Sequence, residues 1–172
     1  MEMYKFPDVV HACIMVVDDH PTTASTLTRA IALLGRGIET LAANSGEQAL
    51  EMALNQPIDI LITDMMMPGI NGLELIDMLR SRTKGYPTHI ILITAYDIAG
   101  RKITAQRLDV NEVIIKPVRP ERICQLVYDA ILRLHDDVPE NLLVSKPVQN
   151  PEGLAFPVHP SITNSISNHE EI

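Results

Sequence analysis

The sequence has few aromatic residues and cysteines, and it has no long apolar run. Of its 172 residues only 3% are aromatic, so a core must be built from aliphatic side chains and methionine, and a hydrophobic content of 46% is enough for one. Two cysteines, each in an apolar stretch, indicate buried thiols in a reducing compartment rather than a disulfide framework. No segment approaches the roughly 18 apolar residues of a membrane span, and the first residues lack the apolar centre of a secretion signal. We therefore expect a cytoplasmic protein.

An excess of positive charge is also missing. The formal net charge is -8, which disfavours nonspecific nucleic-acid binding as the main activity and suits cation binding or ordinary solubility. The length is that of one domain with an appendage. We divide the chain into a domain over residues 1–135 and a proline-, asparagine- and serine-containing tail over 136–172, which lacks apolar periodicity and is expected to be mobile.

Short apolar runs alternate with helical patterns five times along the domain. Such alternation predicts an α/β fold, a five-stranded parallel sheet with helices on both faces. Gly35 and Gly37 are expected to end the first helix as left-handed cap residues. The strands are expected over residues 11–17, 38–42, 58–64, 89–93 and 113–115, and the helices from 20 to 34, 45 to 53, 73 to 80, 98 to 108 and 120 to 134.

The third run, residues 58–64, ends on Asp64 and is followed by Pro68. Taken alone, this acid is as well explained by a cap for the next helix or a solvated turn as by a functional role. The other strands change that interpretation, because parallel strands bring their carboxyl ends to one edge of the sheet. That edge then collects the polar residues that end the strands: Asp18, Asp19, Asp64, Thr94 and Lys116.

Three neighbouring carboxylates repel one another unless a cation joins them. Mg²⁺ is the natural candidate, since it accepts a few carboxylates and leaves room for a phosphate oxygen. Asp64, at the end of the central strand, is the best candidate to accept a phosphoryl group as an aspartyl phosphate. Lys116 would supply positive charge and Thr94 a hydroxyl donor to the same group.

In these features the sequence resembles the receiver domain of two-component response regulators. The resemblance covers roughly residues 10–135 and is carried by Asp18-Asp19, the stretch 64–72 (DMMMPGING), Thr94-Ala95 and Lys116-Pro117. It implies a flavodoxin-like, doubly wound sheet. It also implies that the chain is not an enzyme in the usual sense but a phosphoacceptor, charged by a sensor histidine kinase or a histidine phosphotransfer protein.

The resemblance assigns further roles. Asp64 would be the phosphoacceptor, Thr94 the switch hydroxyl and Lys116 the phosphate-binding lysine, with a cis bond to Pro117. Magnesium ligands would be Asp19 directly, Asp18 largely through water, Asp64, and the main-chain oxygen of Met66. The first helix near residues 21–25 would dock the phosphodonor. The face of the fourth helix, fifth strand and fifth helix would meet an unknown output partner or a second copy of the chain, without direct contact to nucleic acid or membrane.

The sequence departs from the family pattern in two respects. Val113 occupies a place where an aromatic switch residue is common, and its single stiff torsion makes a swinging motion implausible. Met66 and Tyr96 flank the expected acyl phosphate, and neither orients an attacking water well, which predicts slow self-hydrolysis. Two rivals remain. One is a haloacid-dehalogenase-type phosphatase, which needs an acid at the position of Met66. The other is an FMN-binding flavodoxin, but Asp18-Asp19 would repel the phosphate of FMN.

Overall fold

The computed structural model describes residue 6 and residues 10–82, 89–95 and 109–135. The predicted fourth helix, Tyr96 and the tail lie outside these residues. The elements are β1 (Ala12–Val17), α1 (Pro21–Ala32), β2 (Ile38–Ala43), α2 (Gly46–Asn55), β3 (Ile60–Asp64), α3 (Gly72–Arg82), β4 (His89–Thr94), β5 (Glu112–Ile115) and α5 (Pro120–Leu134).

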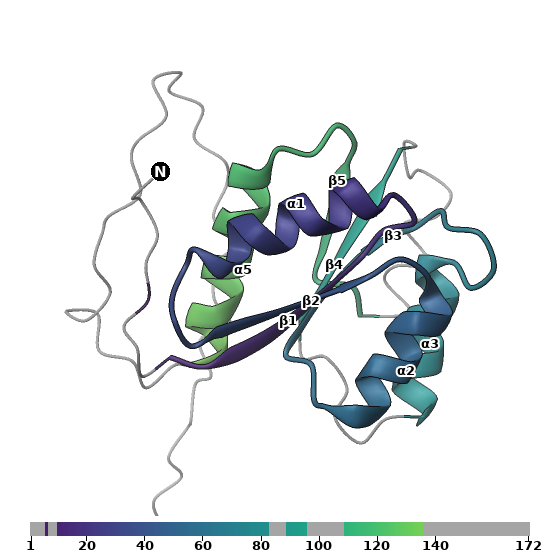
Figure 1. The fold of residues 1–172 in the computed structure, drawn as a ribbon, viewed down its shortest axis with the longest axis horizontal. Helices are drawn as coiled ribbons and strands as arrows, with labels where there is room; N and C mark the ends of the chain where they lie inside the picture. The colour runs from purple at the N-terminus through teal and green to yellow at the C-terminus, as the bar shows by residue number, and fades with distance from the viewer. Residues whose placement is uncertain (1–5, 7–9, 83–88, 96–108, 136–172) are drawn as a thin grey trace, which may run out of the picture.

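The strands form one parallel sheet in the order β2-β1-β3-β4-β5. The direction of strand addition reverses between β1 and β3, which is the position where open α/β sheets place their ligands. α1 and α5 cover one face of the sheet, and α2 and α3 cover the other (Figure 1). The predicted flavodoxin-like, doubly wound fold class is confirmed.

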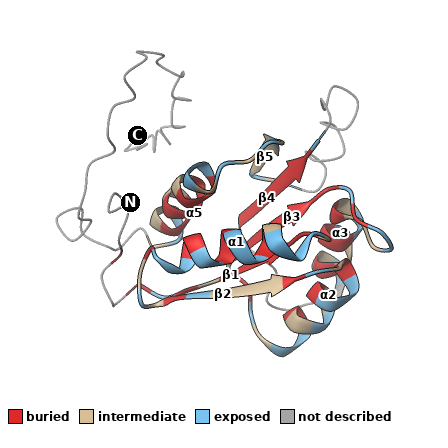
Figure 2. Ribbon diagram, turned by 45° about the horizontal axis from the view of Figure 1, so that its top comes forward, coloured by how far each residue is buried: buried red, intermediate tan, exposed pale blue. Residues whose placement is uncertain are grey.

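Alternate residues of the central strands enter two separate cores. In β1, Ile14 and Val16 face α1 and α5, whereas Met15 and Val17 face α2 and α3. β3 and β4 are buried along their whole lengths, while the edge strand β2 is only partly covered (Figure 2). The apolar runs in the sequence therefore reflect strands that are buried on both faces. Within the described residues, no helix is long and apolar enough to cross a bilayer.

The prediction for Gly35 and Gly37 was wrong in its mechanism. α1 ends at Ala32 with Leu33 in a right-handed conformation, and the two glycines do not have positive φ. Glycine is required there for a steric reason instead, because neighbouring atoms leave little room for a side chain. A Cβ on Gly37 would lie 2.0 Å from the carbonyl oxygen of Val10, so the chain before β1 passes too close for any side chain there.

The two cysteines are free, as expected, but they differ in burial. Cys124 is buried on α5, and burial raises the pKa of its thiol to about 11. Cys13 in β1 is only half-buried, which corrects the expectation of two buried thiols. Its neighbour β2 is the edge strand, so this part of the sheet is not fully covered.

Candidate functional site

Three strands deliver charged side chains to one point at the carboxyl edge of the sheet. Asp18 follows β1, Asp64 ends β3 and Lys116 follows β5. The Lys116 Nζ lies 2.5 Å from Asp64 Oδ2 and 3.4 Å from Asp18 Oδ2. Both acids are buried, with 1% of Asp18 and 4% of Asp64 exposed to solvent. Residues that are 98 and 52 positions apart in sequence are thus joined by one ammonium group.

Burial by itself would lower the pKa of Lys116, because it disfavours the charged amine. The hydrogen bond and the negative charge of Asp64, supported by Asp18, outweigh burial and raise the pKa above its usual value. The lysine is therefore a fixed positive charge at this edge of the sheet. It neutralises part of the repulsion between two carboxylates that share it as a partner.

Asp19 and His20 lie beside Asp18 at the start of α1. The Asp19 side chain is 27% exposed, and its Oδ1 lies 3.2 Å from His20 Nδ1. The same ring nitrogen is 3.4 Å from Asp18 Oδ1, which also accepts the His20 backbone N–H at 2.9 Å. Among the described residues, these three side chains form the one group whose ligand atoms are close enough to hold a metal ion.

Thr94 ends β4 next to this group. It is fully buried, and its carbonyl oxygen accepts the backbone N–H of Lys116 at 2.7 Å. Asp64 pairs in register with Ile93, so Thr94 stands one residue beyond the acid on the neighbouring strand. The Lys116–Pro117 peptide bond is cis, as the resemblance implied.

Two of the three atypical positions, Val113 and Met66, lie within the described residues. Val113 pairs with Leu92 and packs, half-buried, against the core under α2 and α3. Met66 is 49% exposed, while its backbone N–H donates to Asp64 Oδ1 at 3.1 Å. Met65 and Met67 on either side are buried core residues. Tyr96 lies outside the described residues.

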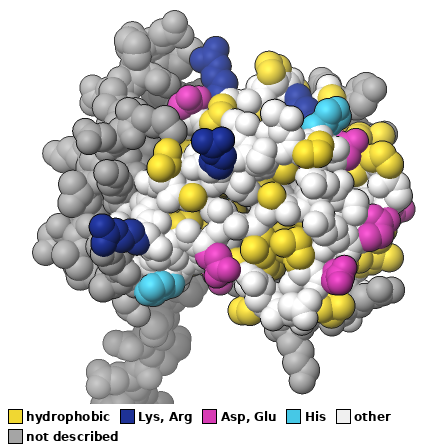
Figure 3. Space-filling model, in the orientation of Figure 1, with side chains coloured by type: hydrophobic (Ala, Val, Ile, Leu, Met, Phe, Trp, Pro, Cys, Tyr) yellow, Lys and Arg dark blue, Asp and Glu magenta, His cyan; other side chains and the backbone are white. Residues whose placement is uncertain are grey.

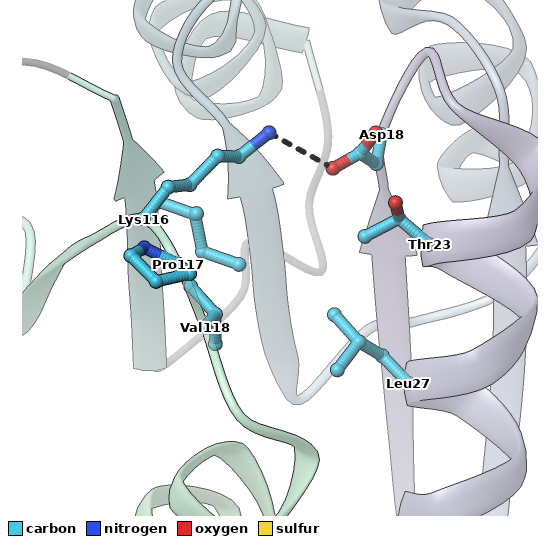
Figure 4. Close-up of a pocket in the computed structure, with 7 residues that line it drawn as sticks. Asp18, Thr23, Leu27, Lys116, Pro117 and Val118 are labelled. Atoms are coloured by element: carbon cyan, nitrogen blue, oxygen red, sulfur yellow. Dashed lines mark hydrogen bonds and ion pairs between the residues drawn. The ribbon is translucent and has the colours of Figure 1, made fainter.

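A pocket of about 450 Å³ opens beside the acids, between α1 and the segment after β5 (Figure 4). Asp18, Thr23 and Lys116 supply its polar part. Leu27 and Val118 lie across from each other in its apolar part, and Ile93 and Pro117 complete the lining. The charged site is therefore continuous with a partly apolar hollow that reaches along α1.

The turn after Asp64 is fastened to the start of α2. Gly69 has a φ of +71°, and the backbone N–H of Ile70 donates to Glu47 Oε1 at 3.1 Å. Hydrogen bonds from the backbone N–H groups of Glu47 itself and of Ile70 hold the pKa of the Glu47 carboxyl below its usual range. A Cβ on Gly46 would lie 2.6 Å from the Ile70 carbonyl oxygen, so the two loops are in direct backbone contact.

Residues 14–128 match the sequence profile of the response regulator receiver domain. The chain belongs to this family. Receiver domains are the phosphoacceptor modules of two-component response regulators, and they bind Mg²⁺ at an acidic pocket. The predicted family and general function are therefore confirmed.

Two curated relatives illustrate the range of the family. The DNA-binding response regulator MtrA of Mycolicibacterium smegmatis is 32% identical over 136 residues, which are 79% of this chain and 57% of that protein. The chain therefore spans little more than half the length of that relative. A CheY homolog of Campylobacter jejuni, a chemotaxis protein, is 32% identical over 119 residues, which are 69% of this chain and 91% of the relative.

Solved receiver domains share the fold. The receiver domain of AraT from Geobacillus stearothermophilus is 31% identical, with a TM-score of 0.63 over 73% of this chain and 97% of its own. The CheY4 chemotaxis protein of Vibrio cholerae is 22% identical, with a TM-score of 0.63 over 70% of this chain and 98% of its own. The latter comparison supports the fold alone.

The predicted site includes the charged residues but leaves out two features next to them. His20 was not among the predicted ligands, although it contacts both acids. The contact between Glu47 and Ile70 was not predicted, because it joins two loops 23 residues apart. The serine, glycine and glutamate at 45–47 signalled only a helix start.

Proposed function

We propose that Asp64 is the phosphoacceptor of this receiver domain. The observation that carries the proposal is the Lys116 amine, which lies 2.5 Å from Asp64 Oδ2 at the switch point of the sheet in a chain of this family. The donor is a phosphohistidine on a sensor kinase or phosphotransfer protein. A carboxylate oxygen of Asp64 forms the new bond to phosphorus while the phosphorus–nitrogen bond breaks. The departing imidazole keeps the electron pair of that bond.

The donor set suits Mg²⁺. Asp18, Asp19 and Asp64 offer hard carboxylate oxygens, and the two buried acids together carry more negative charge than one lysine balances. We assign these carboxylates and the main-chain oxygen of Met66 as the protein's ligands. Bound there, the ion supplies positive charge to the phosphoryl oxygens. Lys116 holds another phosphoryl oxygen, and the Thr94 hydroxyl donates to the phosphorylated form and so reports it to the neighbouring surface.

The decisive experiment is phosphorylation by acetyl phosphate in the presence of Mg²⁺, followed by intact-mass measurement. We expect one added phosphoryl group on the wild-type protein and none on Asp64→Asn. Asp77→Asn is the matched control, because Asp77 is an exposed acid on α3 away from the sheet edge. Equal labelling of Asp64→Asn and the wild type would refute the assignment.

The phosphorylated form should decay slowly. The thioether of Met66 is exposed beside Asp64 and is a poor base for orienting water. The same residue stands where a haloacid-dehalogenase-type phosphatase requires its proton-donating acid, so multiple turnover of a phosphomonoester is not expected. Timing the loss of the phosphoryl group after removal of acetyl phosphate measures this. Decay within seconds would contradict slow self-hydrolysis.

Docking of the phosphodonor is assigned to α1. Residues 21–25 form the first turn of α1, next to the pocket beside the acids, and Thr23 lines that pocket (Figure 4). Lysine and arginine side chains stand singly on the face shown in Figure 3, where acidic and hydrophobic side chains are interspersed among them. A specific protein partner suits such a surface better than nonspecific contact with nucleic acid.

The remaining assignments complete the proposal. We place the receiver domain in residues 1–135, treat 136–172 as a linker or tail, and expect the protein to act in the cytoplasm. The output partner, or a second copy of the chain, would use the face that includes β5 and α5. β5 is an edge strand of the described sheet, and its Ile115 is 52% exposed. The described charges there are mixed: Asp109, Glu112 and Arg122.

A further inference from the structure

We propose that His20 is a metal ligand, so that the ion site of this chain favours transition-metal ions more strongly than a carboxylate site would. The inference rests on the proposed function, because it concerns the same cation site. It adds an imidazole nitrogen to a ligand set that was otherwise composed of oxygen atoms. The metal preference would then be a property of one residue at the start of α1.

The His20 ring nitrogen already lies near the spacing of a neighbouring ligand from each of the two acids. Ligands at right angles around an octahedral ion, each at about 2.1 Å, lie about 3.0 Å from one another. His20 Nδ1 lies 3.2 Å from Asp19 Oδ1 and 3.4 Å from Asp18 Oδ1. Contraction of these two distances by a few tenths of an ångström would therefore bring the imidazole nitrogen to ligand spacing from both acids, whose own ligand oxygens lie within 4.8 Å of each other.

The backbone keeps this arrangement in place. Asp18 Oδ1 accepts the His20 backbone N–H at 2.9 Å, which ties the acid to the residue that carries the imidazole. The His20 carbonyl oxygen accepts the N–H groups of Thr23 and Ala24 at 2.9 and 3.3 Å, so the residue is fixed as the start of α1. Its ring is 74% exposed and can therefore accept an ion from solvent without any change in the core.

The chemistry of the ligands sets the expected preference. Imidazole nitrogen suits Ni²⁺, Zn²⁺ and other later transition metals, whereas Mg²⁺ prefers oxygen and binds imidazole weakly. The neutral ring would carry its proton on Nε2 and direct the Nδ1 lone pair to the ion. Removing the ring should thus weaken Ni²⁺ binding strongly and leave Mg²⁺ binding nearly unchanged.

The test uses the full chain without a polyhistidine tag, at about pH 8, where an ordinary histidine is neutral. Calorimetric titrations with Mg²⁺ and Ni²⁺ compare the wild type, His20→Ala and His11→Ala. His11 is the matched control because it is an exposed histidine at the opposite end of β1. Pulsed electron paramagnetic resonance of bound Mn²⁺ detects whether nitrogen is directly coordinated.

We expect a nitrogen coupling to Mn²⁺ in the wild type and in His11→Ala, and its loss in His20→Ala. We also expect His20→Ala to weaken Ni²⁺ binding at least about tenfold while Mg²⁺ affinity changes less than about twofold. Absence of nitrogen coupling in the wild type, or equal effects on Ni²⁺ and Mg²⁺, would overturn the inference. If Mg²⁺ binds and supports phosphorylation in that case, the proposed function survives. If no divalent ion binds the wild type, both fail.

Discussion

The ion pairs that Lys116 makes with two buried acids lead to a quantitative prediction about the free energy of unfolding. Lys116→Met removes the ammonium group that lies within reach of both Asp18 and Asp64, and it leaves two buried carboxylates facing each other. Removing one partner of a fully buried ion pair costs roughly 3–5 kcal/mol. Because 31% of the lysine side chain is exposed, solvent screens part of the interaction. We therefore expect the free energy of unfolding to fall by about 2–3 kcal/mol.

Urea unfolding with a chelator present measures this loss without interference from divalent ions. Adding Asp18→Asn to Lys116→Met should restore part of the stability, because the repulsion between the two carboxylates is removed while the Asp64 carboxylate stays buried without its partner. Arg29→Met is the control, an exposed cation on α1 whose removal should change stability by less than about 0.5 kcal/mol.

Two results would refute the reasoning. One is a Lys116→Met variant as stable as the wild type at about pH 7 in the chelator. The other is a double variant that is no more stable than Lys116→Met, since a loss that does not respond to removal of the Asp18 charge arises from packing and not from charge.

Three further predictions concern other parts of the molecule. His89 is buried at the start of β4, and its Nε2 has no hydrogen-bond partner among the described residues. Burial, helped by the positive charge of Arg133, lowers its pKa. The unfolded chain then takes up a proton near pH 6.5 while the folded one does not, so the free energy of unfolding should fall on acidification by up to about 1.4 kcal/mol per pH unit. His89→Leu should make this pH dependence weaker, as measured by urea unfolding at several pH values. Ser45 accepts the Gln48 N–H at the start of α2, so Ser45→Ala should cost about 1 kcal/mol in thermal unfolding, whereas the same change at the exposed Ser81 should cost less. Gly72→Ala should destabilise the protein more than either serine substitution, by roughly 2 kcal/mol or more, because the added Cβ would lie 2.3 Å from the Asp64 carbonyl oxygen. An unchanged melting temperature would contradict that steric argument.

Much of the fold could be predicted because its signals are local. The runs that became β3 and β4 are apolar at every position, since both faces of these strands are covered. The rule that parallel strands end at one edge was then sufficient to bring Asp18, Asp64 and Lys116 together before any coordinates were considered. That rule depends on topology alone, so it holds although the three residues are far apart in sequence.

The predictions for Gly37 and Cys13 were wrong because the environment of each residue is set by a segment that lies elsewhere in the sequence. Gly37 looks like a helix cap, but the backbone of Val10 is what excludes a side chain there. Cys13 lies in an apolar run, but it belongs to a strand whose outer neighbour is the sheet edge. A local pattern identifies the element, and it does not reveal what passes next to it.

The contact between Glu47 and Ile70 has a consequence for how a signal could leave the sheet edge. Since the loop that begins after Asp64 is bonded to the first turn of α2, displacement of one must pull on the other. The first turn of α2 thus acts as a brace for the residues next to the acid. Replacing Glu47 with alanine would remove that brace without altering any group that touches Lys116.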